Sequence, residues 1–326
     1  MNKSGTPLKI YCLNLRCGYI RDERDGRDNM VRVRQFRVWK QIKEYDPDVI
    51  AFQECTTGWR AILEDGILDG YTFFHHWNKR GLDIESGGTD LITNPVCWKT
   101  DKYDVLDKGW FWLSPTPEVS SGYEGDSEHR IVVWVQLRDK ATGAEFYFHS
   151  THFSLGEGDR VINSGRQLAR RFHAFPEGTN SFFMGDLNSP YRTYSYCGWA
   201  YEPGLKDMLD VAKDMSADGL CKLGKIKGTY NGFKAPEGYG INDLIICKPN
   251  KRMAIDEYKV LYDMVAVPEK NSPAGYVSDH FAVYTEVRLD TEEDYGKYYE
   301  YGEEAKERLP QTGYITRQEW NKAHGR

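Results

Sequence analysis

The feature that most constrains the fold is a series of short strand-like runs spread along nearly the whole chain. The runs are rich in Val, Ile, Tyr, Phe and Trp, and several alternate apolar with polar residues, as half-buried strands do. They cover residues 8–15, 48–53, 95–98, 103–106, 131–137, 145–150, 181–185, 243–247, 258–265 and 281–289. A Gly-containing turn joins 131–137 to 145–150 and predicts a hairpin. The chain is therefore expected to be built mainly from β-sheet.

Helix-like stretches are fewer and lie between the strands. Residues 31–45 place Val31, Val38, Ile42 and Tyr45 on one face, and Pro47 lies just beyond the expected end. Further helices are expected at 57–68, 163–175 and 205–213. Strands and helices do not alternate strictly, and no G-x-G-x-x-G or Walker sequence occurs, which disfavours a Rossmann fold. The pattern predicts a layered α/β sandwich with sheets inside and helices outside.

The charge of the chain limits its partners. A net charge of −6 argues against a protein held on nucleic acid by a broad basic face. It leaves phosphate substrates open, because a bound cation can supply positive charge locally. Residues 16–37 contain seven arginines interleaved with acids. Such a segment is usually a solvated loop and helix face, although it could also overhang a cleft and bind polyanions.

Cysteine usage and hydropathy bear on the compartment. The seven cysteines show no CxxC pair and no zinc-like spacing, which favours a reducing environment. No apolar run approaches the roughly 18 residues of a membrane span. The polar N-terminus shows no signal peptide. We expect a monomer without an integral membrane segment, cytoplasmic or, if a signal peptide has been removed, periplasmic or secreted.

Polar residues recur where the expected strands begin or end. Each alone has a structural explanation: a paired buried amide, an Asx turn, a cap or a core histidine. Together they supply what phosphate ester hydrolysis needs, namely acids for a hard cation, an acid to orient water, and donors for developing charge. The set comprises Asn14, Gln53-Glu54, Ser150-Thr151-His152, Gly185-Asp186-Leu187-Asn188, Asn242-Asp243 and Ser278-Asp279-His280.

In order and approximate spacing, these motifs resemble the endonuclease/exonuclease/phosphatase superfamily, to which deoxyribonuclease I belongs. The resemblance covers roughly residues 8–289, and residues 110–117 and 130–134 further resemble a bacterial branch. Two departures stand out. No second histidine follows Thr151-His152, which weakens assignment to the sphingomyelinase-like branch. Asn242 precedes Asp243 where relatives carry an apolar residue, but Asp243 still aligns.

The resemblance implies a four-layer α/β/β/α sandwich of two mostly antiparallel sheets. The catalytic domain would span residues 1–290, followed by an acidic C-terminal extension at 291–326. It also implies a Mg²⁺-dependent phosphoesterase, with Mn²⁺ as an alternative ion. A phosphodiester, in nucleic acid, a nucleotide or another molecule, is the favoured substrate. The alternatives are a phosphomonoester of a sugar, an inositol or a lipid headgroup, and an inactive binding protein on the same fold. A calcineurin-like metallophosphatase would need a Gly-Asn-His motif, which the sequence lacks.

Roles for individual residues follow from the same resemblance. Glu54 would be the main Mg²⁺ ligand, with Asn14 and Asp279 beside it. Asp186 would orient and deprotonate the attacking water. Asn188 and His152 would donate hydrogen bonds to phosphoryl oxygens, and His280, held by Asp243, would stabilise charge at phosphorus. Arg130 would contact the substrate phosphate, or would be a solvated hairpin arginine.

Overall fold

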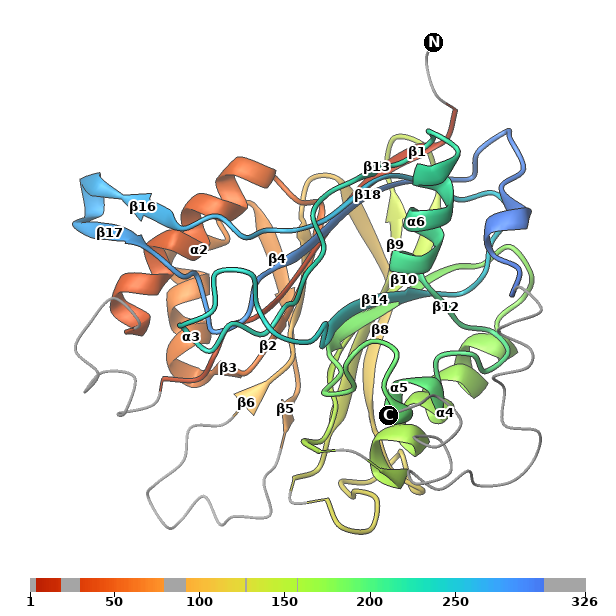
Figure 1. Cartoon of the computed structure of the whole chain (residues 1–326), viewed down its shortest axis with the longest axis horizontal. Helices are drawn as coiled ribbons and strands as arrows, with labels where there is room; N and C mark the ends of the chain where they lie inside the picture. The colour runs from red at the N-terminus through yellow and green to blue at the C-terminus, as the bar shows by residue number, and fades with distance from the viewer. Residues whose placement is uncertain (1–3, 19–29, 79–91, 127, 157, 302–326) are drawn as a thin grey trace.

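Two β-sheets packed face to face form the centre of the structure, and helices lie on their outer faces (Figure 1). This computed structural model describes residues 4–18, 30–78, 92–126, 128–156 and 158–301. The predicted four-layer α/β/β/α sandwich is confirmed. None of the helices within these ranges is long and apolar enough to cross a lipid bilayer.

The first sheet has seven strands. Its central strands β1 and β2 are parallel, and β18 runs antiparallel to β1. Across the sheet the order is β13 (Lys222–Leu223), β15 (Ala254–Val260), β18 (Val283–Leu289), β1 (Thr6–Asn14), β2 (Val49–Gln53), β7 (Val96–Lys99) and β4 (Tyr71–Phe74).

The second sheet has six strands. Strands β10 and β11 are parallel, and the remaining neighbours are antiparallel. The predicted hairpin is present, with Glu145 of β10 opposite Arg138 of β9. The order is β12 (Lys206–Asp207), β14 (Asp243–Cys247), β11 (Asn180–Asp186), β10 (Glu145–His152), β9 (Ile131–Asp139) and β8 (Tyr103–Trp112).

Short elements complete the chain. Two small sheets pair β3 (Cys55–Thr56), β6 (Ile92–Thr93) and β5 (Trp77–Asn78), and β16 (Val265–Val267) with β17 (Ser272–Gly275). The α-helices are α2 (Val31–Tyr45), α3 (Thr57–Ile62), α4 (Asp159–Ala174), α5 (Tyr194–Cys197) and α6 (Met208–Ala217). A π-helix, η1 (Leu63–Ile67), follows α3, and 3₁₀ turns occupy η3 (Pro268–Lys270) and η4 (Gly296–Tyr298).

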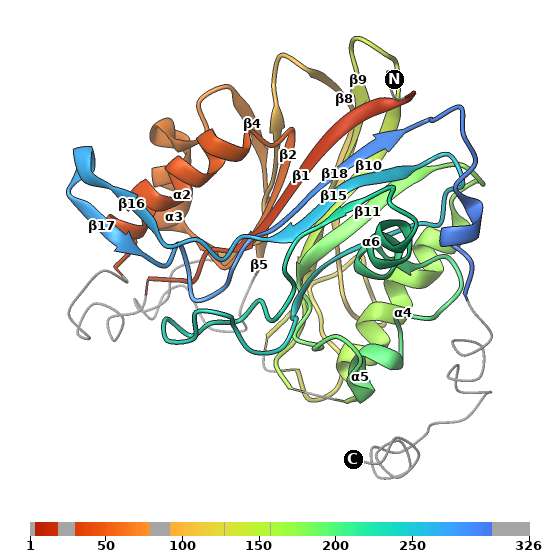
Figure 2. The ribbon, with the colours of Figure 1, turned by 45° about the horizontal axis from the view of Figure 1, so that its top comes forward.

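Both faces of the central strands are buried, which explains their nearly continuous apolar sequences. In β1, Ile10 and Cys12 face the second sheet, while Tyr11 and Leu13 pack against α2 and α3. This alternation follows from the two-residue period of a strand. Helices α4 and α5 cover the outer face of the second sheet. Helix α6 contacts β14 of one sheet and β15 of the other (Figure 2).

The structure corrects the prediction for the arginine-rich segment. Arg34 and Arg37 on α2 are fully buried, although a solvated helix face was expected. Their guanidinium groups donate to backbone carbonyls, which a planar fork of N–H donors can do inside a protein. Residues 19–29 of the same segment lie outside the described residues.

Some predicted boundaries were also wrong. The strand expected at 103–106 continues to Trp112, and the run at 258–265 divides into the end of β15 and the separate β16. In the acidic extension, Tyr298 and Tyr299 pack against the core between the sheets. Residues 302–326 of that extension lie outside the described residues.

Candidate active site

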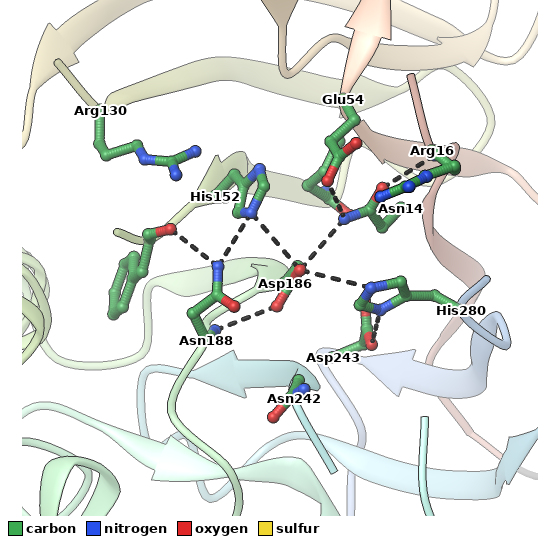
Figure 3. Close-up of polar contacts among 12 residues, drawn as sticks. Asn14, Arg16, Glu54, Arg130, His152, Asp186, Asn188, Asn242, Asp243 and His280 are labelled. Atoms are coloured by element: carbon green, nitrogen blue, oxygen red, sulfur yellow. Dashed lines mark hydrogen bonds and ion pairs between the residues drawn. The ribbon is translucent and has the colours of Figure 1, made fainter. Parts of the chain in front are cut away.

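The strands bring the polar motifs to one rim of the sandwich (Figure 3). Asn14 at the end of β1 pairs in register with Gln53 at the end of β2. In the second sheet His152 pairs with Asp186, and Asp186 with Asp243. Because these positions are strand ends, their side chains meet in space although the sequence separates them.

A glycine sets the spacing of two of these strands. Gly185 has φ of +154°, and a Cβ there would lie 1.8 Å from the carbonyl oxygen of Thr151. Any larger residue would push β11 away from β10. Gly185 thus allows the close approach that places Asp186 beside His152.

Asp186 lies at the centre of the cluster. Its Oδ2 is 3.4 Å from Nε2 of His152 and 3.6 Å from Nε2 of His280, and it accepts a hydrogen bond of 3.1 Å from Nδ2 of Asn14. On the other side of the His280 ring, Nδ1 lies 2.8 Å from Oδ2 of Asp243. All five side chains are buried.

This arrangement separates the protonation behaviour of Asp186 and His280. Burial raises the pKa of Asp186 to about 6; Asp243 and Glu54 add to this rise, and His280 opposes it. Burial lowers the pKa of His280, but the carboxylates of Asp243 and Asp186 outweigh burial and hold it well above the usual value. At neutral pH the ring is therefore a cation between two acids.

Glu54, Asn14 and Asp279 lie on the neighbouring side of the rim. The Glu54 carboxylate accepts from Nδ2 of Asn14 at 3.2 Å and from the backbone N–H of Cys17 at 3.0 Å. The Asp279 carboxylate is 3.4 Å from the guanidinium of Arg16. Burial raises the pKa of Asp279, and nearby Glu54 adds to that rise, while His280 and Arg16 lower it.

His152 and Glu54 influence each other. Burial and the neighbouring Arg130 hold the pKa of His152 well below its usual value, so its ring is neutral at pH 7. Burial opposes ionisation of Glu54, while the charge of a protonated His152, the Cys17 amide and Asn14 lower its pKa. With the imidazole neutral at pH 7, the hydrogen bonds from Cys17 and Asn14 support the Glu54 carboxylate.

The rim collects oxygen donors that suit a divalent cation. Four carboxylates lie there, from half-buried Glu54 and from the buried Asp186, Asp243 and Asp279, with Arg16, Arg34, Arg130 and the charged imidazole of His280 nearby. The carboxylate oxygens, with the Asn14 amide, are the donors that hard cations such as Mg²⁺ prefer.

Geometry alone would select a different trio of ligands. Asp186, Asp243 and His280 each offer an atom within 4.8 Å of the other two. However, Nδ1 of His280 and Oδ2 of Asp243 already pair with each other, and an imidazole that carries a proton on both nitrogens has no lone pair for a metal. The all-oxygen side at Glu54 and Asp279 is chemically the better match.

The residues predicted to bind phosphate lie next to Asp186. Nδ2 of Asn188 lies 3.0 Å from Nε2 of His152 and donates to the carbonyl of Phe153 at 3.0 Å. A phosphoryl oxygen would have to replace one of these contacts.

Arg130 is buried with its guanidinium directed toward His152 (Figure 3). Its Nε has no hydrogen-bond partner among the described residues, and its Nη2 lies 3.5 Å from Glu128. Arg130 is therefore not a solvated hairpin residue.

Several supporting residues were not predicted. Oγ1 of Thr229 accepts the backbone N–H groups of Asn242 and Asp243 at 2.9 and 3.0 Å. The backbone N–H of Asn231 donates to the carbonyl of Asp279 at 2.7 Å. These residues lie in a loop outside the predicted motifs, and no local pattern marks them.

A two-sheet sandwich with carboxylates, imidazoles and amides on one rim is the architecture of the deoxyribonuclease I-like phosphoesterases. The chain belongs to the Endonuclease/Exonuclease/phosphatase family, which it matches over residues 14–280. Members of this family are hydrolases of phosphoesters.

Solved structures support the same fold. An endonuclease/exonuclease/phosphatase family protein of Bacteroides thetaiotaomicron is 25% identical, with a TM-score of 0.72 over 88% of this chain and 99% of that one. A mannosyl-6-phosphatase of the same organism is 24% identical, with a TM-score of 0.71 over 86% and 100%. TDP2 of D. rerio, complexed with a single-strand DNA product, is 17% identical, with a TM-score of 0.62 over 87% and 100%. None of the curated proteins compared with the chain matches it.

Proposed function

We propose that this chain is a divalent-metal-dependent phosphoesterase that cleaves its substrate by in-line attack of water on phosphorus. The observation that carries the proposal is the buried Asp186 carboxylate, which lies between the imidazoles of His152 and His280 and beside Asn14, a neighbour of Glu54. A base, a cationic donor and acidic oxygen ligands are thus within reach of one phosphoryl group.

Glu54, Asn14 and Asp279 would hold the cation, with Mg²⁺ as the expected ion and Mn²⁺ as an alternative. When bound, the cation neutralises negative charge on the phosphoryl oxygens. The proposal fits the two carboxylates and the amide on this side of the rim, and it gives Glu54 and Asp279 a shared ligand despite their like charges.

The remaining steps belong to the side chains around Asp186. The Asp186 carboxylate orients the attacking water and takes its proton. The charged His280, fixed by Asp243, donates from Nε2 to the oxygens on which charge builds up. His152 and Asn188 bind the phosphoryl group from the opposite side, and Arg130 adds a fork of donors.

A phosphodiester is the leading substrate, and a phosphomonoester is the second candidate. Arg130 favours the monoester, since a second cationic donor group suits a dianion better than a monoanion. The relatives include both a mannosyl-6-phosphatase and a protein solved with a DNA product. Fold alone does not choose between them.

The test is a panel of phosphate esters incubated with the purified chain and Mg²⁺ or Mn²⁺. The panel contains DNA, RNA, nucleotides, sugar phosphates, phosphoinositides and model mono- and diesters. We expect turnover that chelation abolishes and that Glu54→Ala and Asp186→Ala each reduce by at least about a hundredfold. Glu64→Ala, which removes an exposed carboxylate on η1, is the control and should leave turnover unchanged. Metal-independent turnover, or full activity of either site variant, would contradict the proposal.

Salt dependence separates nucleic acid from small esters. Binding to nucleic acid weakens steeply with salt when many phosphates are neutralised. The net charge of −6 and the few cations at the rim predict a shallow dependence, equivalent to no more than about two or three phosphate contacts. A steep slope would instead assign the chain to long nucleic acid substrates.

A further inference from the structure

Two residues on the side of the rim where the cation is proposed have a left-handed backbone conformation, which residues other than Gly and Asn rarely adopt. Arg16 has φ of +59° and Glu54 has φ of +53°. Such conformations persist only where the surroundings over-determine them. The turn at Arg16 also has a direct effect on the site, since it aims the Cys17 N–H at the Glu54 carboxylate and the Arg16 guanidinium at Asp279.

Two buried donors hold the turn at Arg16. Its carbonyl oxygen accepts from Nη2 of Arg34 at 3.1 Å and from Nε1 of Trp59 at 2.9 Å. Arg34 comes from α2 and Trp59 from α3, the two helices on the outer face of the first sheet. Both side chains are fully buried, and the Arg34 guanidinium lies 5.3 Å from the centre of the Trp59 ring.

Arg34 also joins this turn to the other side of the site. Its Nη1 donates to the carbonyl of Leu15 at 2.6 Å and reaches the carbonyl of Val277 at 3.4 Å. Leu15 directly follows Asn14, and Val277 is two residues before Asp279. A single planar fork therefore ties the backbone beside one expected ligand to the backbone beside another.

A second ring near the Arg34 guanidinium extends this link. The centre of the Phe233 ring lies 5.6 Å away, and Phe233 belongs to the loop in which Asn231 donates to the backbone carbonyl of Asp279. Trp59 is the third residue of α3, the helix that starts two residues after Cys55, the neighbour of Glu54. The segments that carry Asn14, Glu54 and Asp279 all meet around this one side chain.

We infer that Arg34 is a positioning residue for cation binding: its buried guanidinium fixes the segments that carry Asn14, Glu54 and Asp279 relative to one another before a cation arrives. The inference rests on the proposed metal-dependent function. A buried cation is costly unless it is well hydrogen-bonded, and an apolar residue could fill the same volume between the helices. The backbone carbonyls of Leu15, Arg16 and Val277 accept hydrogen bonds from the Arg34 guanidinium. They also belong to the segments that must be held in place for the cation ligands.

The experiment measures Mn²⁺ affinity of the full chain by electron paramagnetic resonance, without any substrate. In Arg34→Met we expect binding to weaken by at least about tenfold, the usual effect of removing a group that orients metal ligands. The matched control is Arg37→Met. Arg37 lies on the same helix, is equally buried and also donates to carbonyls, among them those of Pro273 and Tyr276, which lie further from Asp279 along the chain than Val277 does. It should change Mn²⁺ affinity by less than about threefold. Equal losses in both variants would overturn the inference.

Two further variants distinguish the hydrogen-bonding geometry of Arg34 from its positive charge. They also keep the inference testable if Arg34→Met does not fold. Arg34→Lys keeps the charge but replaces two donor nitrogens held in a planar fork by a single one, so its Mn²⁺ affinity should stay weak; recovery to the wild-type value would overturn the inference. Trp59→Phe keeps an aromatic ring but loses the indole N–H that holds Arg16, together with part of the ring volume, and should also weaken Mn²⁺ binding. Unchanged affinity in this variant would contradict a role for the turn at Arg16.

The outcome also distinguishes this inference from the proposed function. If the wild-type chain shows no Mn²⁺ binding that Glu54→Ala removes, the proposed metal-dependent function fails. If that binding is present and Arg34→Met retains it in full, the proposed function stands and only the positioning role of Arg34 is lost.

Discussion

Asp186 combines an acid of unusual basicity with a central place among the site residues. Burial raises its pKa to about 6, close to the pH at which the chain would operate. A general base works best when its pKa lies near the operating pH, because it is then ionised yet still takes a proton readily. The structure thus gives Asp186 the property that the proposed role requires.

The pH dependence of activity follows from this value. Only the ionised carboxylate can accept a proton, so kcat/KM should rise with pH through an inflection at or below about 6, since a bound cation favours the ionised form. Asp186→Asn should lower kcat/KM by at least about a hundredfold and remove this limb. Initial rates between pH 4 and pH 9, at saturating metal, check both points. An unchanged limb in the variant would assign the inflection to another group.

Asp243 should act through His280. Its carboxylate raises the pKa of that imidazole, so Asp243→Asn should lower the pKa of His280 and reduce turnover by about a hundredfold. Imidazole resonances followed by NMR during a pH titration give the shift directly. His149, whose pKa burial lowers to about 4 and whose Nδ1 faces the carbonyl of Phe182, is the internal control. A His280 titration identical to wild type would rule out this coupling.

At the scale of elements, strand β14 and helix α2 could be predicted with the bounds that the structure shows. Each has a local signal in the sequence. Strand β14 is an apolar run that begins at an acid, and α2 has an apolar face that ends before Pro47. Strand β8 was cut short because it is an edge strand. Its second half carries Asp107, Lys108 and Gly109 around a bulge, and a solvent-facing edge needs no apolar residues.

The candidate site also has residues that the sequence could predict and residues that it could not. Polar residues at strand ends are visible in the sequence, so Asp186 and His280 could be chosen before their distance was known. The support from Arg34 and Trp59 could not be predicted, because it depends on a left-handed turn at Arg16 and on contacts between distant segments. The solvated face expected for Arg34 shows that charge patterns do not reveal burial.

The pairing of β10 with β11 should depend strictly on Gly185. In Gly185→Ala the new Cβ would meet the Thr151 carbonyl at 1.8 Å, and we expect a loss of at least about 3 kcal/mol in the free energy of unfolding. Gly58→Ala on α3 is the control: its Cβ would have 3.8 Å of room, so stability should stay within about 1 kcal/mol of wild type. Denaturant unfolding measures both. A stable Gly185→Ala variant with wild-type turnover would show that the strands can separate without cost.

At the scale of the whole molecule, the site brings together residues from both ends of the domain. Asn14 and His280 lie near opposite ends of the family match, and both reach the rim around Asp186. The rim holds carboxylates from both sheets, and their mutual repulsion opposes the packing that the apolar core between the sheets supports. A cation held by Glu54, Asn14 and Asp279 would join the ends of β1 and β2 to the segment before β18, beside the carboxylates of the second sheet.

Cation binding should therefore stabilise the entire fold. A ligand that binds only the folded state adds about 2.7 kcal/mol to the free energy of unfolding at one hundred times its dissociation constant. We expect Mg²⁺ or Mn²⁺ to raise the denaturation midpoint of the wild-type chain and of Glu64→Ala, but not of Glu54→Ala, which loses the main ligand. Urea titrations with a series of metal concentrations, followed by tryptophan fluorescence, provide the measurement. The same stabilisation in Glu54→Ala would move the cation to a different set of ligands, with Asp186, Asp243 and His280 as the first alternative.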